Sequence, residues 1–264
     1  MATLACMQMQ VKMTGLVTQE DICEEISAIA TMDHSGPAEA QPRLNYWPYR
    51  SSVLRHPRKN LPIVDPEGVE LCAPCFGAGD VSPLDADLTI GHAGAPIGER
   101  VVITGSVTDS SGRPVANQLV EIWQANAAGR YIHQQDQHPA PLDPNFTGVG
   151  RCITGPDGSY QFITVKPGPY PWRNHINAWR PAHIHFSVFG TRFTERLVTQ
   201  MYFPGDPLFP LDPICQAVTD PAARARLIAV YDHALSRPEV ATGYRFDIVL
   251  DGSRRTPIET THRD

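Results

Sequence analysis

The feature of this sequence that most constrains its fold is a series of short apolar runs, beginning near residue 98 and continuing almost to the end. The runs are rich in Val, Ile, Thr and aromatic residues, and turn-forming segments such as 109–112 and 155–158 separate them. This pattern is typical of short β-strands joined by tight turns. We expect strands at residues 100–108, 118–124, 159–165, 183–189, 196–203 and 244–251.

One helix is expected within this β-rich region. Asp220 can cap it, Pro221 suits its first turn, and Leu227, Tyr231 and Ala234 would share one face. The 25 prolines and 20 glycines lie between the apolar runs, as turn-rich connections require. Together these features predict a mostly β protein: an antiparallel β-sandwich core with long loops and few short helices.

The chain is expected to divide into three parts. Residues 1–43 are interpreted as an N-terminal extension, with a short amphipathic helix at 18–32 followed by a polar linker. Residues 44–255 form the predicted β-sandwich domain, and residues 256–264 form a C-terminal tail.

Charge and hydropathy exclude several kinds of partner. The formal net charge is −6 and no run of Lys and Arg is present, so we expect no nucleic-acid partner. No apolar stretch approaches the roughly 20 residues that a membrane span needs. Gln8, Gln10 and Lys12 interrupt what would be the apolar part of a secretory signal. The sequence therefore predicts a soluble, cytoplasmic protein.

The six cysteines are too scattered to indicate a disulfide scaffold in a chain of 264 residues. Cys72 and Cys75 form a single Cys-x-x-Cys motif, but no second pair stands at a spacing typical of structural zinc. No βαβ pattern surrounds the motif, as a redox role would require. We therefore expect two ordinary thiols in a loop.

A histidine pair is the sharpest local signal of chemistry. In the strand expected at 183–189, alternation places His183 and His185 on one face, and Ile184 and Phe186 on the other. Two imidazoles on one face can both reach a single metal ion. Zinc lyases, cupins and many hydrolases share this spacing, so it does not name the metal. An ordinary polar role for one or both histidines also stays open.

Six segments around this pair carry a longer pattern. They are 123–131 (WQANAAGRY), 142–151 (LDPNFTGVGR), 166–173 (KPGPYPWR), 179–186 (WRPAHIHF), 200–206 (QMYFPGD) and 244–250 (YRFDIVL). In content and order they resemble the intradiol ring-cleavage dioxygenases, from about residue 44 to about residue 255. The resemblance implies a β-sandwich enzyme that holds one non-haem iron(III) ion per chain. Such an enzyme cleaves a catechol ring with dioxygen between its two hydroxylated carbons.

By motif, the resemblance also assigns roles to individual residues. The implied iron ligands are Tyr131, Tyr170, His183 and His185. Tyr170 takes the axial position from which it would leave the metal and accept a substrate proton, and Arg180 would stabilise charge near the iron-bound oxygens. The implied substrate-binding residues are Tyr49, Trp172, Gln200 and Ile214. Phenolate is a hard anionic donor that suits a ferric ion, although no spacing rule would have selected these tyrosines.

The resemblance further implies a substrate and a partner. The expected reaction converts protocatechuate and dioxygen to 3-carboxy-cis,cis-muconate in the β-ketoadipate pathway, with catechol and hydroxyquinol as alternative substrates. The expected partner is a homologous alpha chain in a hetero-oligomer. Two other hypotheses stay open: a zinc hydrolase or lyase that uses His183 and His185, and a non-catalytic subunit that serves assembly alone.

Overall fold

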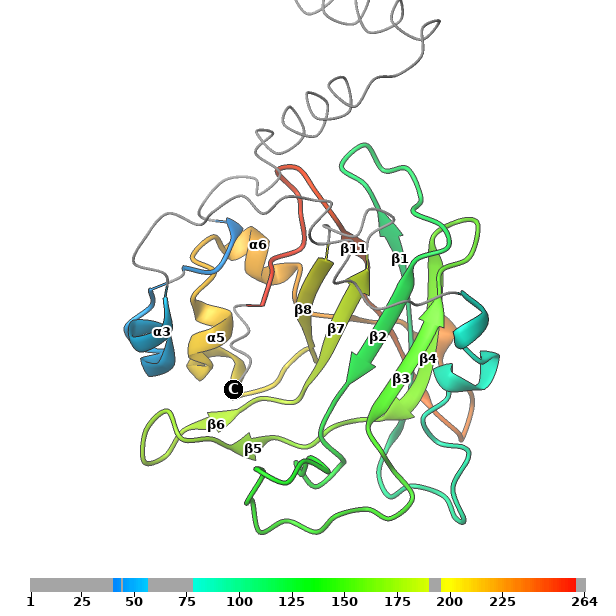
Figure 1. The fold of residues 1–264 in the computed structure, drawn as a ribbon, viewed down its shortest axis with the longest axis horizontal. Coiled ribbons are helices and arrows are strands. Elements are labelled where there is room, and N and C mark those ends of the chain that lie inside the picture. Colours follow the sequence, from blue (N-terminus) through cyan, green and yellow to red (C-terminus); the bar gives the residue numbers. More distant parts are fainter. Residues whose placement is uncertain (1–39, 44, 57–77, 190–195, 260–264) are drawn as a thin grey trace, which may run out of the picture.

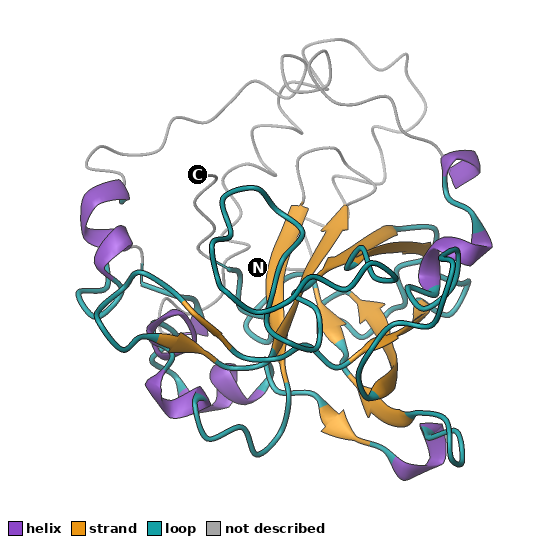
Figure 2. Ribbon diagram, turned by 90° about the horizontal axis from the view of Figure 1, so that it is seen from below, coloured by secondary structure: helices purple, strands orange, loops and turns teal. Residues whose placement is uncertain are grey.

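Two facing β-sheets form the core of the protein, as Figures 1 and 2 show for the computed structural model. The structure describes residues 40–43, 45–56, 78–189 and 196–259. The first sheet contains β1 (Arg100–Thr108), β4 (Ser159–Val165), β9 (Val230–Tyr231), β10 (Thr242–Arg245) and β11 (Ile248–Val249). The second sheet contains β2 (Leu119–Trp123), β3 (Val149–Ile153), β7 (His183–Phe189) and β8 (Arg196–Tyr202). The predicted mostly β fold is confirmed.

The two sheets differ in strand direction. The second sheet has the order β3-β2-β7-β8 and is antiparallel throughout. In the first sheet, β1 pairs with β4 in antiparallel fashion and with both β10 and β11 in parallel fashion. The sequence predicted one strand at 244–251, but the structure has two short strands there, β10 and β11. Phe246 and Asp247 separate them, and the amide of Phe246 still bonds the carbonyl oxygen of Thr104 on β1.

The helices are short, and Figure 2 shows them at the edges of the strands. The α-helices are α3 (Arg50–Arg55), α5 (Pro213–Gln216) and α6 (Pro221–Ala225). The 3-10 helices are η3 (Ala78–Asp80), η4 (Pro83–Ala86), η5 (Phe209–Leu211) and η6 (His233–Leu235). No helix among the described residues is long and apolar enough to cross a membrane. The helix expected at 18–32 and the Cys72–Cys75 motif lie outside the described residues.

The helix predicted after Asp220 is only partly correct. Asp220 caps α6, because its carboxylate accepts a hydrogen bond from the amide of Ala222. The helix ends at Ala225, however, and the predicted continuation is wrong: Tyr231 lies in β9 and Ala234 in η6. The backbone of Tyr202 on β8 exchanges hydrogen bonds with the chain at 227–229. Pairing with the sheet therefore takes over from the helical spacing of the apolar side chains.

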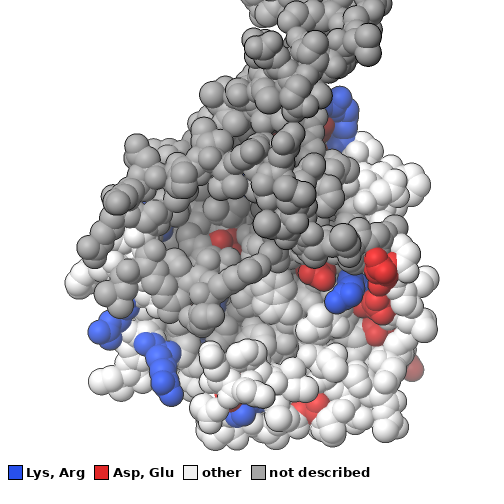
Figure 3. Space-filling model, in the orientation of Figure 1, with Lys and Arg blue, Asp and Glu red and all other residues white. Residues whose placement is uncertain are grey.

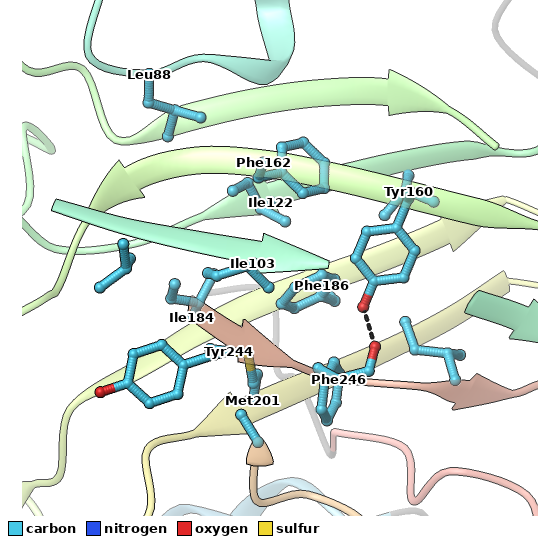
Figure 4. Packing of buried hydrophobic residues seen from close by; sticks show 14 of the residues in the cluster. Leu88, Ile103, Ile122, Tyr160, Phe162, Ile184, Phe186, Met201, Tyr244 and Phe246 are labelled. Carbon is cyan, nitrogen blue, oxygen red and sulfur yellow. Dashed lines mark hydrogen bonds between the residues drawn. The ribbon is translucent and has the colours of Figure 1, made fainter. Parts of the chain in front are cut away.

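The core lies between the sheets and explains the orientation of β7. Ile184, Phe186 and Val188 are fully buried in it, as alternation along the strand predicts. Figure 4 shows Phe186 close to Phe162 of the opposite sheet, and their ring centroids are 6.3 Å apart. Packing of this face against the opposite sheet holds β7 in place. The side chains of His183 and His185 project from the other face of the same strand.

A glycine turn carries the chain from one sheet to the other between β3 and β4. Gly158 has a φ of +74°, and its amide bonds the carbonyl oxygen of Gly155. An added Cβ at this position would also approach the carbonyl oxygen of Val107. Glycine is required here on both counts.

A small two-stranded ribbon of β5 (Tyr170–Pro171) and β6 (Trp179–Arg180) leads directly into β7. In Figure 1 this ribbon lies beyond the lower ends of β7 and β8, with α5 above it. On the face shown in Figure 3, the described acidic and basic side chains are interspersed among uncharged ones. This mixed surface agrees with the modest net charge of −6.

Candidate metal centre and its surroundings

The two histidines of β7 lie side by side, with ring centroids 4.9 Å apart. His183 Nδ1 is 2.7 Å from the carbonyl oxygen of Pro181, and His185 Nδ1 is 2.8 Å from Oε2 of Glu259. Because a carbonyl and a carboxylate only accept hydrogen bonds, each Nδ1 carries the proton. Nε2 is then the nitrogen of each ring that can bind a cation, and that of His183 is contacted by the Tyr170 hydroxyl.

Two tyrosines complete a closed group of four rings. Tyr131 and Tyr170 meet edge to face with ring centroids 5.4 Å apart. The ring centroid of Tyr170 is 5.5 Å from that of His183, and the ring centroid of Tyr131 is 6.5 Å from that of His185. The Tyr170 hydroxyl is 3.3 Å from His183 Nε2. The structure therefore brings together all four residues that the resemblance singled out as ligands.

Local structure fixes each tyrosine. Tyr131 follows a tight turn in which Gly129 has a φ of +76° and the side chain of Asn126 accepts two backbone hydrogen bonds. Its own amide donates to the carboxylate of Asp136 at 2.8 Å. Tyr170 lies in β5, directly opposite Arg180 of β6. Tyr131 is thus held by a turn that two side chains cap, and Tyr170 by strand pairing.

The protonation state of these groups fits a cation site. Burial raises the pKa of the Tyr131 hydroxyl well above its usual value, and burial also raises the pKa of Tyr170. Burial, followed by the nearby Arg180 charge, lowers the pKa of His183 well below its usual value. The Tyr131 hydroxyl is buried and has no hydrogen-bond partner among the described residues. A cation would satisfy this orphaned oxygen and bring the tyrosine pKa values down.

The donor set could not have been found by a search for acidic or sulfur ligands. Among the described residues, no group of three or more His, Cys, Asp and Glu side chains is arranged to hold a metal ion. The four-ring group offers two imidazole nitrogens and two phenol oxygens instead. Phenolate oxygens are hard anionic donors, so the residues present fit a highly charged, oxygen-preferring cation such as ferric iron.

A buried arginine borders the rings. Arg180 Nη2 donates to Asp212 Oδ2 at 3.0 Å, to the Tyr202 hydroxyl at 3.2 Å, and to Oε1 of Gln200. The Arg180 and Asp212 side chains are only 4% and 0% exposed. The two N–H groups of this nitrogen are shared among three buried acceptors, which hold the guanidinium beside the four-ring group.

The predicted substrate-binding residues are partly connected to this arginine. Its guanidinium lies over the ring of Trp172, at 5.5 Å from the centroid, and Trp172 in turn contacts Tyr49 with ring centroids 5.4 Å apart. Gln200 lies opposite His185 across the β7–β8 pair. Ile214 is nine-tenths buried on α5 and is linked to the network through Asp212, whose carboxylate caps that helix at the Ile214 amide.

Four further residues at the site were missed by the sequence analysis: Trp123, Tyr202, Asp212 and Glu259. Trp123 stacks on His185, with centroids 4.7 Å apart and planes 6° from parallel. Trp123 lies on β2 directly opposite His185, so its place in the site can be predicted only when the pairing of β2 with β7 is known. Asp212 stands out in the sequence as an acid among apolar neighbours, whereas Glu259 carries no local signal.

An open groove of about 660 Å³ at the β9–β10 edge is lined by none of the site residues.

The fold and the site define a class: a β-sandwich in which two histidines of one strand meet two tyrosines beside a buried arginine. Residues 71–252 match the family model described as dioxygenase, and residues 35–67 match that of the protocatechuate 3,4-dioxygenase beta subunit N terminal.

Known proteins agree with this class. The protocatechuate 3,4-dioxygenase beta chain of Burkholderia cepacia is 57% identical over 213 residues, which cover 80% of this chain and 90% of the relative. The alpha chain of the same enzyme is 32% identical and covers 70% of this chain and 88% of the relative. The crystal structure of 3-chlorocatechol 1,2-dioxygenase from Rhodococcus opacus gives a TM-score of 0.50 at 25% identity, over 68% of this chain and 70% of that one.

The chain therefore belongs to the intradiol ring-cleavage dioxygenase family. It is a dioxygenase of aromatic compound breakdown, and the family depends on non-haem iron. The family and enzyme class expected from the sequence are confirmed.

Proposed function

We propose that this chain binds one iron(III) ion through Tyr131, Tyr170, His183 and His185 and cleaves protocatechuate to 3-carboxy-cis,cis-muconate. We propose further that a homologous alpha chain completes the enzyme. The observation that carries the proposal is the closed group of four rings, in which neighbouring ring centroids are at most 6.5 Å apart.

The chemistry of the four side chains supports ferric iron over zinc. Ferric iron bound to these residues would supply a Lewis-acidic centre that binds both diol oxygens and makes the ring reactive toward dioxygen. Two phenolates provide the negative charge that a trivalent ion needs, whereas zinc sites in proteins use Cys, His and carboxylate ligands. A zinc hydrolase would leave the Tyr131 hydroxyl without a role in the site.

Two residues are proposed to act on the substrate directly. Tyr170 would accept a proton from a diol hydroxyl at its own phenol oxygen, which lies 3.3 Å from His183 Nε2. Arg180 would stabilise the negative charge that develops on the substrate oxygens. Its rigid anchoring to Asp212, Tyr202 and Gln200 means that little reorganisation is needed when this charge appears.

Protocatechuate is favoured by the high similarity to a beta chain named for that substrate, which extends over 90% of the relative. Tyr49, Trp172, Gln200 and Ile214 are proposed to line the substrate pocket, with Tyr49 nearest the carboxylate. The homologous alpha chain is proposed to supply the rest of this pocket.

The test is oxygen uptake with protocatechuate, catechol and hydroxyquinol, with and without an alpha chain, together with identification of the product. We expect the fastest turnover with protocatechuate, a carboxymuconate product, and a visible tyrosinate-to-iron absorption band. Tyr170→Phe should lower kcat by about 100-fold or more, as loss of a proton-transferring residue typically does. Tyr231→Phe is the matched control, because Tyr231 is 47% exposed and lies on β9, in the sheet that does not contain the two histidines.

Three results would contradict the proposal. A colourless, iron-free protein that is inert toward all three diols would reject the metal site. A semialdehyde product would reject cleavage between the hydroxylated carbons. Turnover unchanged in Tyr170→Phe would reject its role as proton acceptor and favour a subunit that serves assembly.

A further inference from the structure

A carboxylate from the C-terminal tail contacts one of the two histidines. Glu259 Oε2 lies 2.8 Å from His185 Nδ1, although the two residues are 74 positions apart in the sequence. Their side chains are only 7% and 10% exposed. An acid this deeply buried is rare unless it has a specific partner, and here the partner is a ring of the proposed metal centre.

The tail reaches this position through a chain of backbone contacts. The Thr199 hydroxyl on β8 donates to the carbonyl oxygen of Pro257 at 2.7 Å, and the Glu259 amide donates to the carbonyl oxygen of Val198 at 2.6 Å. The Ile258 amide donates to the side chain of Gln41 at 2.9 Å. In Figure 1 the red C-terminal segment accordingly runs beside β8.

The contact has a direct consequence for His185. A carboxylate that accepts the Nδ1 proton favours the Nδ1–H tautomer of the ring, which leaves the Nε2 lone pair available to a cation. Trp123 stacks flat against the same ring and fixes its plane. His185 is therefore restrained both at its edge and on its face.

The two histidines differ in this respect. His183 Nδ1 donates to the carbonyl oxygen of Pro181, which is a dipole without net charge. The carboxylate of Glu259 pulls more strongly on the Nδ1 proton, and it thereby makes the opposite nitrogen of His185 the stronger electron-pair donor toward a cation.

We infer that Glu259 is a positioning residue of the metal centre: it fixes the tautomer and orientation of His185 and strengthens its binding to the cation. The effect on cation binding rests on the proposed function, whereas the effect on the tautomer of His185 does not. Residues 256–259 are thereby part of the working site, although they follow the segment that matches the dioxygenase family model.

The test compares Glu259→Ala, Glu259→Gln and the parent chain, all as full-length protein. Nitrogen NMR of the histidine rings in the metal-free protein reports the tautomer of His185 without any metal. We expect the Nδ1–H form alone in the parent and a mixture that includes Nε2–H in Glu259→Ala. Glu259→Gln should keep the Nδ1–H form, because its amide oxygen can still accept the hydrogen bond.

The second measurement is iron affinity, by competition with a chelator followed at the visible absorption band. Glu259→Ala should bind iron about 10- to 100-fold more weakly, and Glu259→Gln should fall between it and the parent. Glu121→Gln is the matched control, because this acid lies on β2 and pairs with the half-exposed Arg151. Thermal unfolding of the metal-free variants shows whether each one folds.

The outcomes separate this inference from the proposed function. A parent His185 in the Nε2–H form, or a folded Glu259→Ala variant with parental iron affinity, would overturn the role of Glu259. A parent protein with the Nδ1–H tautomer but no iron binding would instead overturn the proposed metal site, and with it the effect on affinity. If Glu259→Ala does not fold, parental iron affinity in a folded Glu259→Gln variant overturns the inference instead.

Discussion

Removal of the negative charge of Asp212 should strongly destabilise the protein. Asp212 is fully buried, and its carboxylate accepts hydrogen bonds from Arg180 at 3.0 Å and from the Tyr202 hydroxyl at 2.8 Å. In Asp212→Asn the amide oxygen can keep the Oδ1 cap of α5 at Ile214, while the NH2 group replaces Oδ2, which accepts from Arg180 and Tyr202. The variant therefore keeps the helix cap and removes the charge and the acceptor that compensate Arg180.

The magnitude follows from the burial of the arginine. Removing one partner of a buried ion pair costs about 3–5 kcal/mol, because the other charge is left uncompensated. For a chain of this size, each kcal/mol lowers Tm by about 2–4 °C, which gives a fall of about 6–20 °C. Asp212→Ala should cost about 1 kcal/mol more, because it also removes the cap of α5.

The assay is urea unfolding of Asp212→Asn, with Glu121→Gln as the control. The Arg151–Glu121 pair is 41% and 27% exposed at a separation of 3.5 Å, so its loss should cost less than about 1 kcal/mol. Adding Arg180→Met to Asp212→Asn should cost less than the sum of the two single changes, because no buried cation then remains. Equal stability of Asp212→Asn and Glu121→Gln would refute the reasoning that Asp212 compensates Arg180.

Three further predictions concern the core, the thiols and metal uptake. Gly105→Ala should destabilise the protein by more than about 3 kcal/mol in urea unfolding, because the added Cβ would overlap the carbonyl oxygen of Phe246; an unchanged midpoint would contradict this. Burial raises the pKa of the Cys152 and Cys215 thiols to about 12, so at pH 8 both should be alkylated about a thousand-fold more slowly in the native protein than after unfolding. Peptide mass spectrometry measures the two rates. Burial also raises the pKa of Tyr170, so this hydroxyl should be protonated before the metal binds. Ferric uptake at neutral pH should then release one proton fewer in Tyr170→Phe than in the parent. An equal number of protons released by both proteins in a pH-stat titration would show that Tyr170 keeps its proton.

The sequence predicted best where local pattern and packing agree. The strand expected at 183–189 has the bounds of β7, because Ile184, Phe186 and Val188 alternate with polar residues and all three enter the core. The continuation of the helix after Asp220 was wrong for the opposite reason. There the local spacing of apolar residues competes with pairing to β8, which only the folded chain provides.

The site was predictable to a smaller extent. Alternation alone selected His183 and His185, since both lie on one regular strand. Tyr131 lies outside any strand and Tyr170 in a strand of two residues, so only the resemblance to a family pointed to them. Glu259 was assigned to a tail, because its contact with His185 depends on how the chain end packs beside β8.

The buried polar groups around the rings bear on the proposed choice of metal. Asp212 pairs with Arg180, and the side chain of Glu259 lies against His185. If both tyrosines bind a cation as phenolates, they add two negative charges to buried surroundings. Such charges are costly to bury without compensation. Under the proposed function a highly charged cation such as ferric iron would supply that compensation, which is a physical reason to expect it there rather than zinc.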